Sequence, residues 1–334
     1  MKRSILLLFL LAWSSILFAD KAATLLDIKR PNSLIVDAER FYVVERTTIF
    51  VYSLKDYKLQ TKFGKQGEGP QEFMVRPNGD VRIYPLDDYI YIDSIGRVSV
   101  FTKAGEFVKE KAVLSGQRFQ PLGHDRYVGY GNITEDNRNY LTINLYDAEV
   151  KGIKELFRQV NMNQSNEIRV FFTTLSFETY KERVFLCGRE DFIIDAFDKT
   201  GKKLFTIDRE YKRGKVTEQD KKNVIDWYKQ DPRYDEAQFQ IIKQMLRFPD
   251  YFRAIDQIRA KDDKLYVRTH KVKDGKYEFL VFDIDGKYLE TKYIPLEKGD
   301  PVYPYPYDIG NGNIYQLIEN LDTEEWNLHV TKFD

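Results

Sequence analysis

Residues 89–108 read YIYIDSIGRVSVFTKAGEFV, and this stretch decides the fold. The runs at 89–92 and 98–101 alternate β-branched, aromatic and other apolar residues, which is the pattern of a half-buried strand. A turn at 103–105 follows, in which Gly105 can supply the positive φ that a tight hairpin needs, and it leads into a further strand that begins Glu106-Phe-Val. We therefore expect three consecutive antiparallel strands here.

The end of the second run, Phe101-Thr102, has counterparts along the whole chain. They stand at Tyr52-Ser53, Tyr146-Asp147, Phe197-Asp198, Phe282-Asp283 and Phe333-Asp334. The spacing is about 50 residues, except for one interval that a helical insert of about 34 residues would explain, and such a repeat is typical of a β-propeller or a solenoid. A second aromatic ladder has the same period: Tyr42, Tyr91, Tyr127, Phe185, Tyr266 and Tyr315.

The repeat predicts an all-β chain folded as a six-bladed β-propeller with four strands in each blade. The first strands are expected at 33–36, 80–84, 118–120, 171–175, 254–258 and 305–308. The sixth blade would lack its outer strand, and the segment 24–28 ahead of the first blade can supply it. Such a closure removes the free sheet edges that invite aggregation.

One segment, 217–248, departs from the strand pattern. Its apolar residues Phe239, Ile242 and Leu246 recur at helical spacing, and Asp231-Pro232 interrupts the run. We expect a helical hairpin at about 215–250, inserted between blades 4 and 5.

The N-terminus has the pattern of an export signal. Lys2-Arg3 precede an apolar run at 5–18, which is shorter than a membrane span of about 20 residues, and Ala19 offers a cleavage site. We expect a signal peptide at 1–19 and a single propeller domain at 20–334, exported to the periplasm or the extracellular space. The mature chain would then have no transmembrane span. An uncleaved anchor is the alternative.

The composition excludes several classes of partner and site. Lys plus Arg and Asp plus Glu both number 52, so no net charge favours nucleic acid or an anionic membrane. Cys187 is the only cysteine, which rules out an internal disulfide, and we expect it to be a small buried apolar residue. His124, His270 and His329 lie far apart without metal-binding spacing, so no metal or other cofactor is predicted.

The glycine-rich stretch 64–73, GKQGEGPQEF, has a superficial similarity to a phosphate-binding loop. It lacks the Lys-Ser/Thr of a P-loop and leads into a strand, so no helix N-terminus would face a phosphate. We interpret it as a link between blades, in which the glycines let the backbone pass close to the next blade and Phe73 fills the crevice between the two blades.

The connections between the second and third strands differ in length. Long ones are expected at 129–139, 270–276 and 320–325, on the same face as the helical insert, and long loops on a rigid scaffold often carry function. The candidate ligand-binding residues on this face are Arg46, Arg97, Asn132, Arg189, His270 and Asn320. The basic ones could hold an anionic group, or could simply pair with neighbouring acidic residues.

Residues 64–108 resemble an NHL repeat, through the Gly-Pro-x-x-Phe link, the Tyr-Ile-Asp strand, the pair Gly96-Arg97 and the glycine turn. The chain from residue 20 onward resembles the bacterial exported six-bladed β-propellers of the NHL-like class. This resemblance implies a scaffold for ligands or partners. Some members are lactonase-like or lyase-like enzymes that hold calcium or zinc in the central channel, but their metal ligands have no clear counterparts here.

These observations favour a non-enzymatic, monomeric propeller that binds a peptide, a polysaccharide or a partner protein on its loop-rich face. Nucleic acid is not an expected partner. The alternative is a metal-dependent hydrolase or lyase, with a lactonase-like site in the central channel and calcium as the possible cofactor. The sequence therefore leaves open whether the protein is an enzyme.

Overall fold

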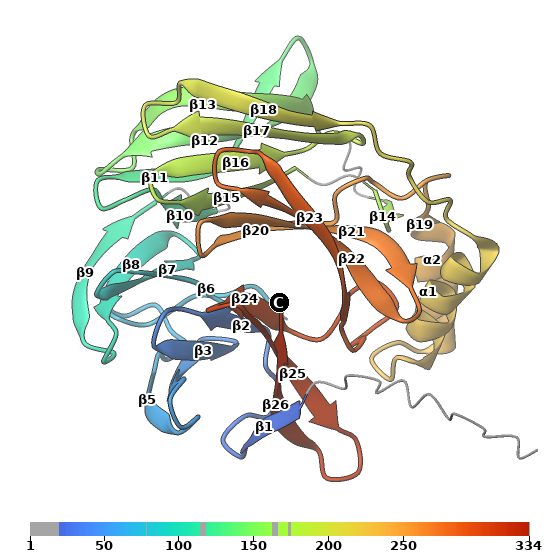
Figure 1. Ribbon diagram of the computed structural model, residues 1–334, viewed down its shortest axis with the longest axis horizontal. Coiled ribbons are helices and arrows are strands. Elements are labelled where there is room, and N and C mark those ends of the chain that lie inside the picture. Colours follow the sequence, from blue (N-terminus) through green and yellow to red (C-terminus); the bar gives the residue numbers. More distant parts are fainter. Residues whose placement is uncertain (1–19, 78, 114–117, 162–165, 173–174, 334) are drawn as a thin grey trace, which may run out of the picture.

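The computed structural model describes residues 20–77, 79–113, 118–161, 166–172 and 175–333. Six four-stranded antiparallel sheets surround a central axis as the blades of a β-propeller (Figure 1). This arrangement confirms the fold that the aromatic repeat predicts. The expected signal peptide at 1–19 lies outside the described residues.

In blades 1 to 5 the strands pair in chain order, from an innermost strand beside the axis to an outermost strand. Blade 1 contains β2 (Ser33–Val36), β3 (Arg40–Glu45), β4 (Thr48–Ser53) and β5 (Leu59–Phe63). Blade 2 contains β6 (Arg82–Leu86), β7 (Tyr89–Ser94), β8 (Arg97–Thr102) and β9 (Phe107–Ala112). Blade 3 contains β10 (Phe119–Pro121), β11 (Arg126–Glu135), β12 (Arg138–Asp147) and β13 (Gly152–Val160). Blade 4 contains β15 (Ser176–Tyr180), β16 (Arg183–Cys187), β17 (Phe192–Asp198) and β18 (Lys203–Arg209). Blade 5 contains β20 (Gln257–Lys261), β21 (Lys264–Lys273), β22 (Lys276–Asp283) and β23 (Tyr288–Pro295).

Blade 6 is completed by an N-terminal strand, as predicted, but this strand covers Asp20–Leu25 rather than 24–28. Its order is β24 (Tyr307–Gly310), β25 (Asn313–Asn320), β26 (Glu325–Lys332) and then β1 (Asp20–Leu25). Leu25 pairs with Trp326 across β1 and β26, and both side chains are buried in one apolar cluster with residues of blade 1. The two ends of the chain therefore close the ring together.

The apolar core lies mainly between neighbouring blades. Between blades 1 and 2, Phe73 is fully buried among residues of both sheets, including Tyr42 and Phe101 from the two aromatic ladders. Gly64 has a φ of +96°, and a Cβ there would lie 2.2 Å from the Thr47 carbonyl oxygen. Both observations agree with the interpretation of 64–73 as an inter-blade link.

The innermost strand of blade 1 has its predicted bounds, 33–36, but the other five innermost strands begin later than the sequence predicts. β6 begins at Arg82 rather than 80, and β20 begins at Gln257 rather than 254. The expected strand at 171–175 was wrong: Phe171, Phe172 and Leu175 are not in a strand, and β15 begins at Ser176. Phe171 instead packs with Val170, Val216 and Leu246 under the helical insert, so its apolar run reflects that packing and not sheet pairing.

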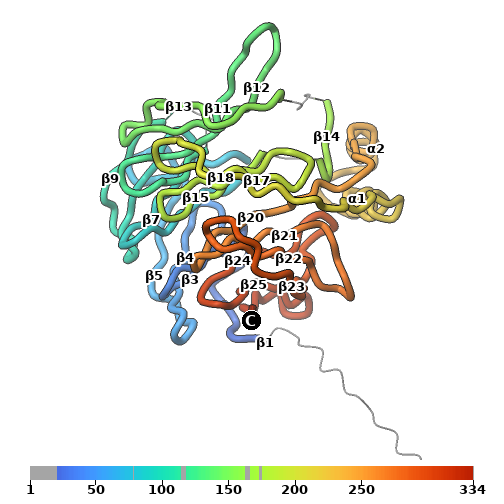
Figure 2. Tube along the Cα trace, turned by 45° about the horizontal axis from the view of Figure 1, so that its top comes forward, coloured from blue at the N-terminus to red at the C-terminus, as the bar shows by residue number. Residues whose placement is uncertain are grey.

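The insert between blades 4 and 5 contains α1 (Glu218–Gln230) and α2 (Glu236–Met245), at the rim of the propeller (Figures 1 and 2). Thr217 and Asp220 form the capping box of α1. A two-stranded parallel sheet of β14 (Ile168–Arg169) and β19 (Leu246–Arg247) ties the end of α2 to the segment ahead of blade 4.

Of the long connections expected at 129–139, 270–276 and 320–325, the first two are mostly strand, whereas the third is a turn at 321–324 between β25 and β26. β11 and β12 pair along their whole length to a turn at Asp136-Asn137, and this hairpin projects beyond the other blades (Figure 2). β21 and β22 continue to a turn at Asp274-Gly275 in the same way. The residues that were expected to form loops instead lengthen the two strands of each hairpin. Backbone hydrogen bonding between antiparallel strands can continue beyond the body of the blade as it does within it.

Candidate functional site

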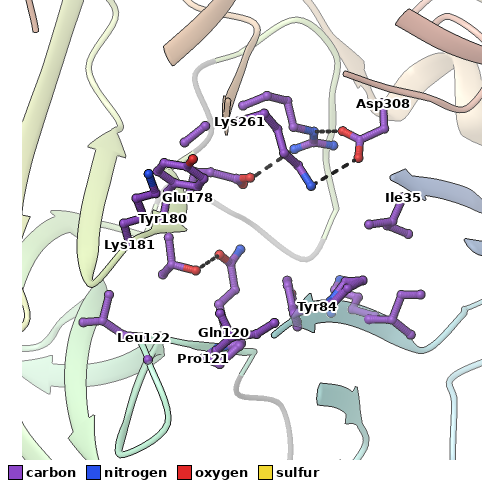
Figure 3. A pocket seen from close by; sticks show the side chains of 18 of the residues that line it. Ile35, Tyr84, Gln120, Pro121, Leu122, Glu178, Tyr180, Lys181, Lys261 and Asp308 are labelled. Atoms are coloured by element: carbon purple, nitrogen blue, oxygen red, sulfur yellow. Dashed lines mark hydrogen bonds and ion pairs between the residues drawn. The ribbon is translucent and has the colours of Figure 1, made fainter. Parts of the chain in front are cut away.

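The innermost strands of all six blades line one cavity of about 670 Å³. The cavity runs along these strands from residues ahead of them, such as Asp80 and Arg118, to the turns that follow them, such as Gly123 and Lys181. It therefore follows the central channel of the propeller. Figure 3 shows side chains from several blades pointing into it.

One side chain per blade enters the channel at the same level of the repeat. Each is the residue that pairs across the first hairpin with a second-strand aromatic: Ile35 with Tyr42, Tyr84 with Tyr91, Pro121 with Tyr127, Glu178 with Phe185, Arg259 with Tyr266 and Asp308 with Tyr315. All six of these inner residues line the cavity. The ring is apolar or aromatic in blades 1 to 3 and charged in blades 4 to 6.

The charged part of this ring forms a connected network. Arg259 lies 3.7 Å from a Glu178 carboxylate oxygen and 3.5 Å from an Asp308 carboxylate oxygen (Figure 3). Lys261 lies 3.6 Å from Asp308 and donates a hydrogen bond of 2.7 Å to the Val36 carbonyl oxygen. Burial raises the pKa of Glu178, and the neighbouring Arg259 opposes that rise. Each charge in this sector therefore has an opposite charge beside it.

Blades 2 and 3 supply a second group of charges. Arg82 lies 3.6 Å from the buried carboxylate of Asp93 on β7. Burial raises the pKa of Asp93 to about 7, although Arg82 favours the ionised form. The Arg118 Nε donates a hydrogen bond of 3.5 Å to the Tyr84 hydroxyl. Burial also raises the pKa of Asp80, against the effect of Arg82 and Arg118.

A neutral polar contact joins blade 3 to blade 4 inside the channel. The Thr179 hydroxyl donates to the Gln120 Oε1 at 3.3 Å (Figure 3). The Gln120 Nε2 donates to the Phe177 carbonyl oxygen at 3.3 Å. Gln120 is buried, and these bonds satisfy its amide. This contact stabilises the part of the cavity wall that separates the charged network of blades 4 to 6 from the charged residues of blades 2 and 3.

None of the six residues that the sequence predicts as ligand contacts lines the cavity. Arg97 donates to the carbonyl oxygens of Glu68 and Gly69 and lies 3.5 Å from Glu110. Arg189 forms an ion pair of 3.0 Å with Asp195. Both guanidiniums thus pair locally, which is the alternative that the sequence leaves open.

The other four lie apart from one another. The Arg46 backbone N–H donates to Asn32, and the Asn320 side chain accepts from the backbone of Asp322 in its turn. Asn132 is exposed on β11, where it pairs with Leu141. His270 is stacked on Phe252, and burial lowers its pKa to about 4. A ligand-binding role for these residues remains a prediction.

One feature of the sequence could have identified the channel residues. Once the second-strand aromatics are aligned, the residue that pairs with each of them is fixed by the hairpin register. Glu178, Arg259 and Asp308 would then stand out as the charged residues at this position, which is apolar or aromatic in the other three blades. Their separation along the chain hides them from a motif search.

Two further observations concern metals and membranes. Among the residues that the structure describes, no three side chains of His, Cys, Asp or Glu are grouped so that they could hold a metal ion. Within the same residues, none of the helices has the length and apolarity needed to span a membrane.

Searches against protein-family models and against curated proteins gave no match to this sequence. Among solved structures, the chain is similar to BamB from Moraxella catarrhalis, with 12% identity, a TM-score of 0.33 and coverage of 88% of this chain and 70% of that one. It is also similar to the Pan2 WD40 domain of Neurospora crassa, with 8% identity, a TM-score of 0.46 and coverage of 91% of each chain. A member of the DUF4221 family from Bacteroides vulgatus gives 10% identity, a TM-score of 0.44 and coverage of 94% and 95%. Since these TM-scores are below 0.5, the fold assignment depends on the strand pairing described above.

Proposed function

We propose that this protein is an exported, non-enzymatic β-propeller that binds a peptide, a polysaccharide or part of a partner protein in its central channel. The observation that supports this function is the cavity of about 670 Å³, to which all six blades contribute. This volume is within the range of about 300–1,000 Å³ that is usual for ligand sites. Export is inferred from the N-terminal sequence pattern, and we expect the protein to act as a monomer.

The composition of the wall supports binding. Blades 2 to 6 contribute charged residues to the cavity wall, and blade 1 contributes the apolar Ile35. A ligand in the cavity would therefore meet both polar groups and apolar surface. Ion pairs and hydrogen bonds hold most of the charged side chains in place before a ligand arrives. Such preorganisation lowers the cost of binding.

The test is to occlude the channel. Ile35 points into the cavity (Figure 3), so Ile35→Trp should fill part of it. Ile133→Trp makes the same change on the projecting β11–β12 hairpin, where Ile133 is exposed, and is the matched control. Each immobilised chain, spanning residues 20–334, is equilibrated with native envelope extract, and retained compounds are identified by mass spectrometry.

We expect the wild type and Ile133→Trp to retain the same compound and Ile35→Trp to lose it while keeping its far-UV circular dichroism spectrum. Equal retention by Ile35→Trp would place the site elsewhere. If Ile133→Trp alone lost retention, the predicted hairpin-bearing face would be the better site.

A further inference from the structure

The charged residues of the channel wall are almost all paired. Among the described residues, every Asp, Glu, Lys, Arg or His side chain that lines the cavity lies within 4.0 Å of a group that can carry the opposite charge, apart from Asp80 and Arg118. At the turns, for example, His124 lies 2.8 Å from Asp87, and Lys181 lies 2.5 Å from Asp263. The channel is thus left with one cation and one anion that lack an ion-pair partner.

Arg118 is held so that its guanidinium remains available. Its carbonyl oxygen accepts a hydrogen bond of 3.2 Å from the Tyr130 N–H, which fixes the backbone just ahead of β10. Its Nε contacts the Tyr84 hydroxyl, and no hydrogen bond joins either Nη atom to another residue of the described ranges. A guanidinium has five donors in a planar fork, so most of the hydrogen-bonding capacity of Arg118 is unused.

Asp80 stands ahead of β6, at the same end of the innermost strands as Arg118. The N–H of the next residue, Val81, donates to the Arg46 carbonyl oxygen at 2.8 Å, which anchors this part of the chain to blade 1. Arg82 and Arg118 are both close enough to lower the pKa of Asp80, although burial raises it more. Asp80 and Arg118 line the same cavity on adjacent blades, whose innermost strands β6 and β10 contact each other, but they do not form an ion pair.

We propose that the channel recognises a carboxylate and an ammonium group carried close together on one ligand, as in a free amino acid or a short peptide with free termini. The carboxylate would accept hydrogen bonds from Arg118, and the ammonium would donate to Asp80. This inference depends on the proposed channel site and narrows its ligand to a free amino acid or a short peptide.

A ligand with only one charge fits this wall less well. A simple anion at Arg118 would leave Asp80 without a partner and would be repelled by it. A simple cation at Asp80 would leave Arg118 unpaired in the same way. Leaving a partly buried charge without a partner is costly, whereas a zwitterion satisfies both groups and adds no net charge to a wall whose other charges are already paired.

The experiment uses four small probes and the folded chain of residues 20–334. The probes are alanine, dialanine, N-acetylalanine and alanine amide, and their binding is measured by isothermal titration calorimetry. We expect alanine or dialanine to bind at least about tenfold more tightly than the two blocked compounds, as the loss of one charge-assisted hydrogen bond implies. The tighter of the first two identifies the source as a free amino acid or a peptide.

Two substitutions assign the roles. Arg118→Met should abolish the preference for a free carboxylate, so that the tighter zwitterion and alanine amide bind alike, and Asp80→Asn should abolish the preference for a free amine. Arg40→Met, which alters a partly buried arginine on β3 outside the cavity, is the control and should leave both preferences intact. Arg118→Lys keeps the charge without the fork and should retain part of the carboxylate preference, should Arg118→Met fail to fold.

Two outcomes would overturn the inference. If the blocked compounds bound as tightly as the free ones, or if no probe bound, the channel would not select a zwitterion. Retention of an extract compound that Ile35→Trp abolishes would still support a channel ligand in that case. Only retention that is insensitive to Ile35→Trp would overturn the proposed function itself.

Discussion

The Asp308 carboxylate accepts a hydrogen bond of 2.8 Å from the backbone N–H of Val36. Asp308 is on β24 in blade 6 and Val36 is on β2 in blade 1, so this bond joins the last blade to the first beside the channel. Lys261 of blade 5 contacts both residues, through an ion pair with Asp308 and a hydrogen bond to the Val36 carbonyl oxygen. The ring is thus closed by buried charge at its axis and by the β1–β26 ladder at its rim.

Replacing Asp308 should weaken the ring. Asp308→Ala would remove the acceptor for Val36 and leave Arg259 and Lys261 with fewer partners, at a cost of about 3 kcal/mol in the free energy of unfolding. Urea denaturation measures this difference. Asp308→Asn keeps an acceptor oxygen and should cost less, while Asp56→Ala at an exposed turn should cost almost nothing. A loss below about 1 kcal/mol for Asp308→Ala would mean that this contact does not hold the blades together.

Because β1 is the outermost strand of blade 6, replacing two adjacent leucines near its end should have very different effects on stability. Leu25 on β1 is 1% exposed and packs in a cluster with Leu328 and residues of blade 1, whereas Leu26 is 77% exposed. Leu25→Ala should lower the free energy of unfolding by about 2–5 kcal/mol, because it leaves a cavity in that cluster. Leu26→Ala should change it by less than about 0.5 kcal/mol. Equal effects in thermal or urea denaturation would show that β1 is not an integral strand of blade 6.

The helical insert should be removable. The Val216 N–H donates to the Asp250 carbonyl oxygen at 3.0 Å, so the two ends of the insert lie side by side and a short glycine-serine linker can replace 217–248. The only strand within the insert, β19, pairs with β14 and with no blade. We expect the shortened chain to unfold in one cooperative transition with a propeller-like circular dichroism spectrum. Loss of that transition would show that the apolar cluster of Val170 and Phe171 needs the helices for the propeller to fold.

The sequence predicts the blades because their second and third strands carry apolar and aromatic residues that pack between sheets. Tyr42 and Phe101, for example, belong to the two aromatic ladders and meet in one cluster. The innermost strands lack this signal, since one of their faces meets the channel and carries residues such as Arg82 and Asp308. The predicted positions of five of the six were therefore displaced, and the run at 171–175 was assigned to a strand although Phe171 packs under the insert.

The candidate site was harder to predict than the fold. The residues that converge on the channel come from six strands in six blades, and only the ring geometry brings Glu178 and Asp308 to the same arginine. The basic residues that the sequence predicts as ligand contacts, such as Arg97, were chosen because they stand at the starts of the expected loops between strands. Their local contacts could not be known without the register of neighbouring strands.

Asp93 should make stability depend on pH in the direction opposite to that of a typical paired carboxylate. Burial raises its folded-state pKa to about 7, against an ordinary value of 3.8. Between these two values the folded protein retains a proton that the unfolded chain has lost. This group therefore stabilises the fold most below pH 4, and its contribution falls by about 1.4 kcal/mol per unit as the pH rises toward 7.

Asp93→Asn removes this titration and nearly conserves the shape of the side chain. The free energy of unfolding of the variant, measured by urea denaturation from pH 4 to pH 8, should rise relative to that of the wild type up to about pH 7 and then run parallel to it. Arg82→Met removes the cation that favours ionised Asp93, so it should extend the sloping region to higher pH. If the wild-type and Asp93→Asn curves were parallel throughout, Asp93 would be ionised in the folded protein, and the ion pair with Arg82 would outweigh the cost of burial.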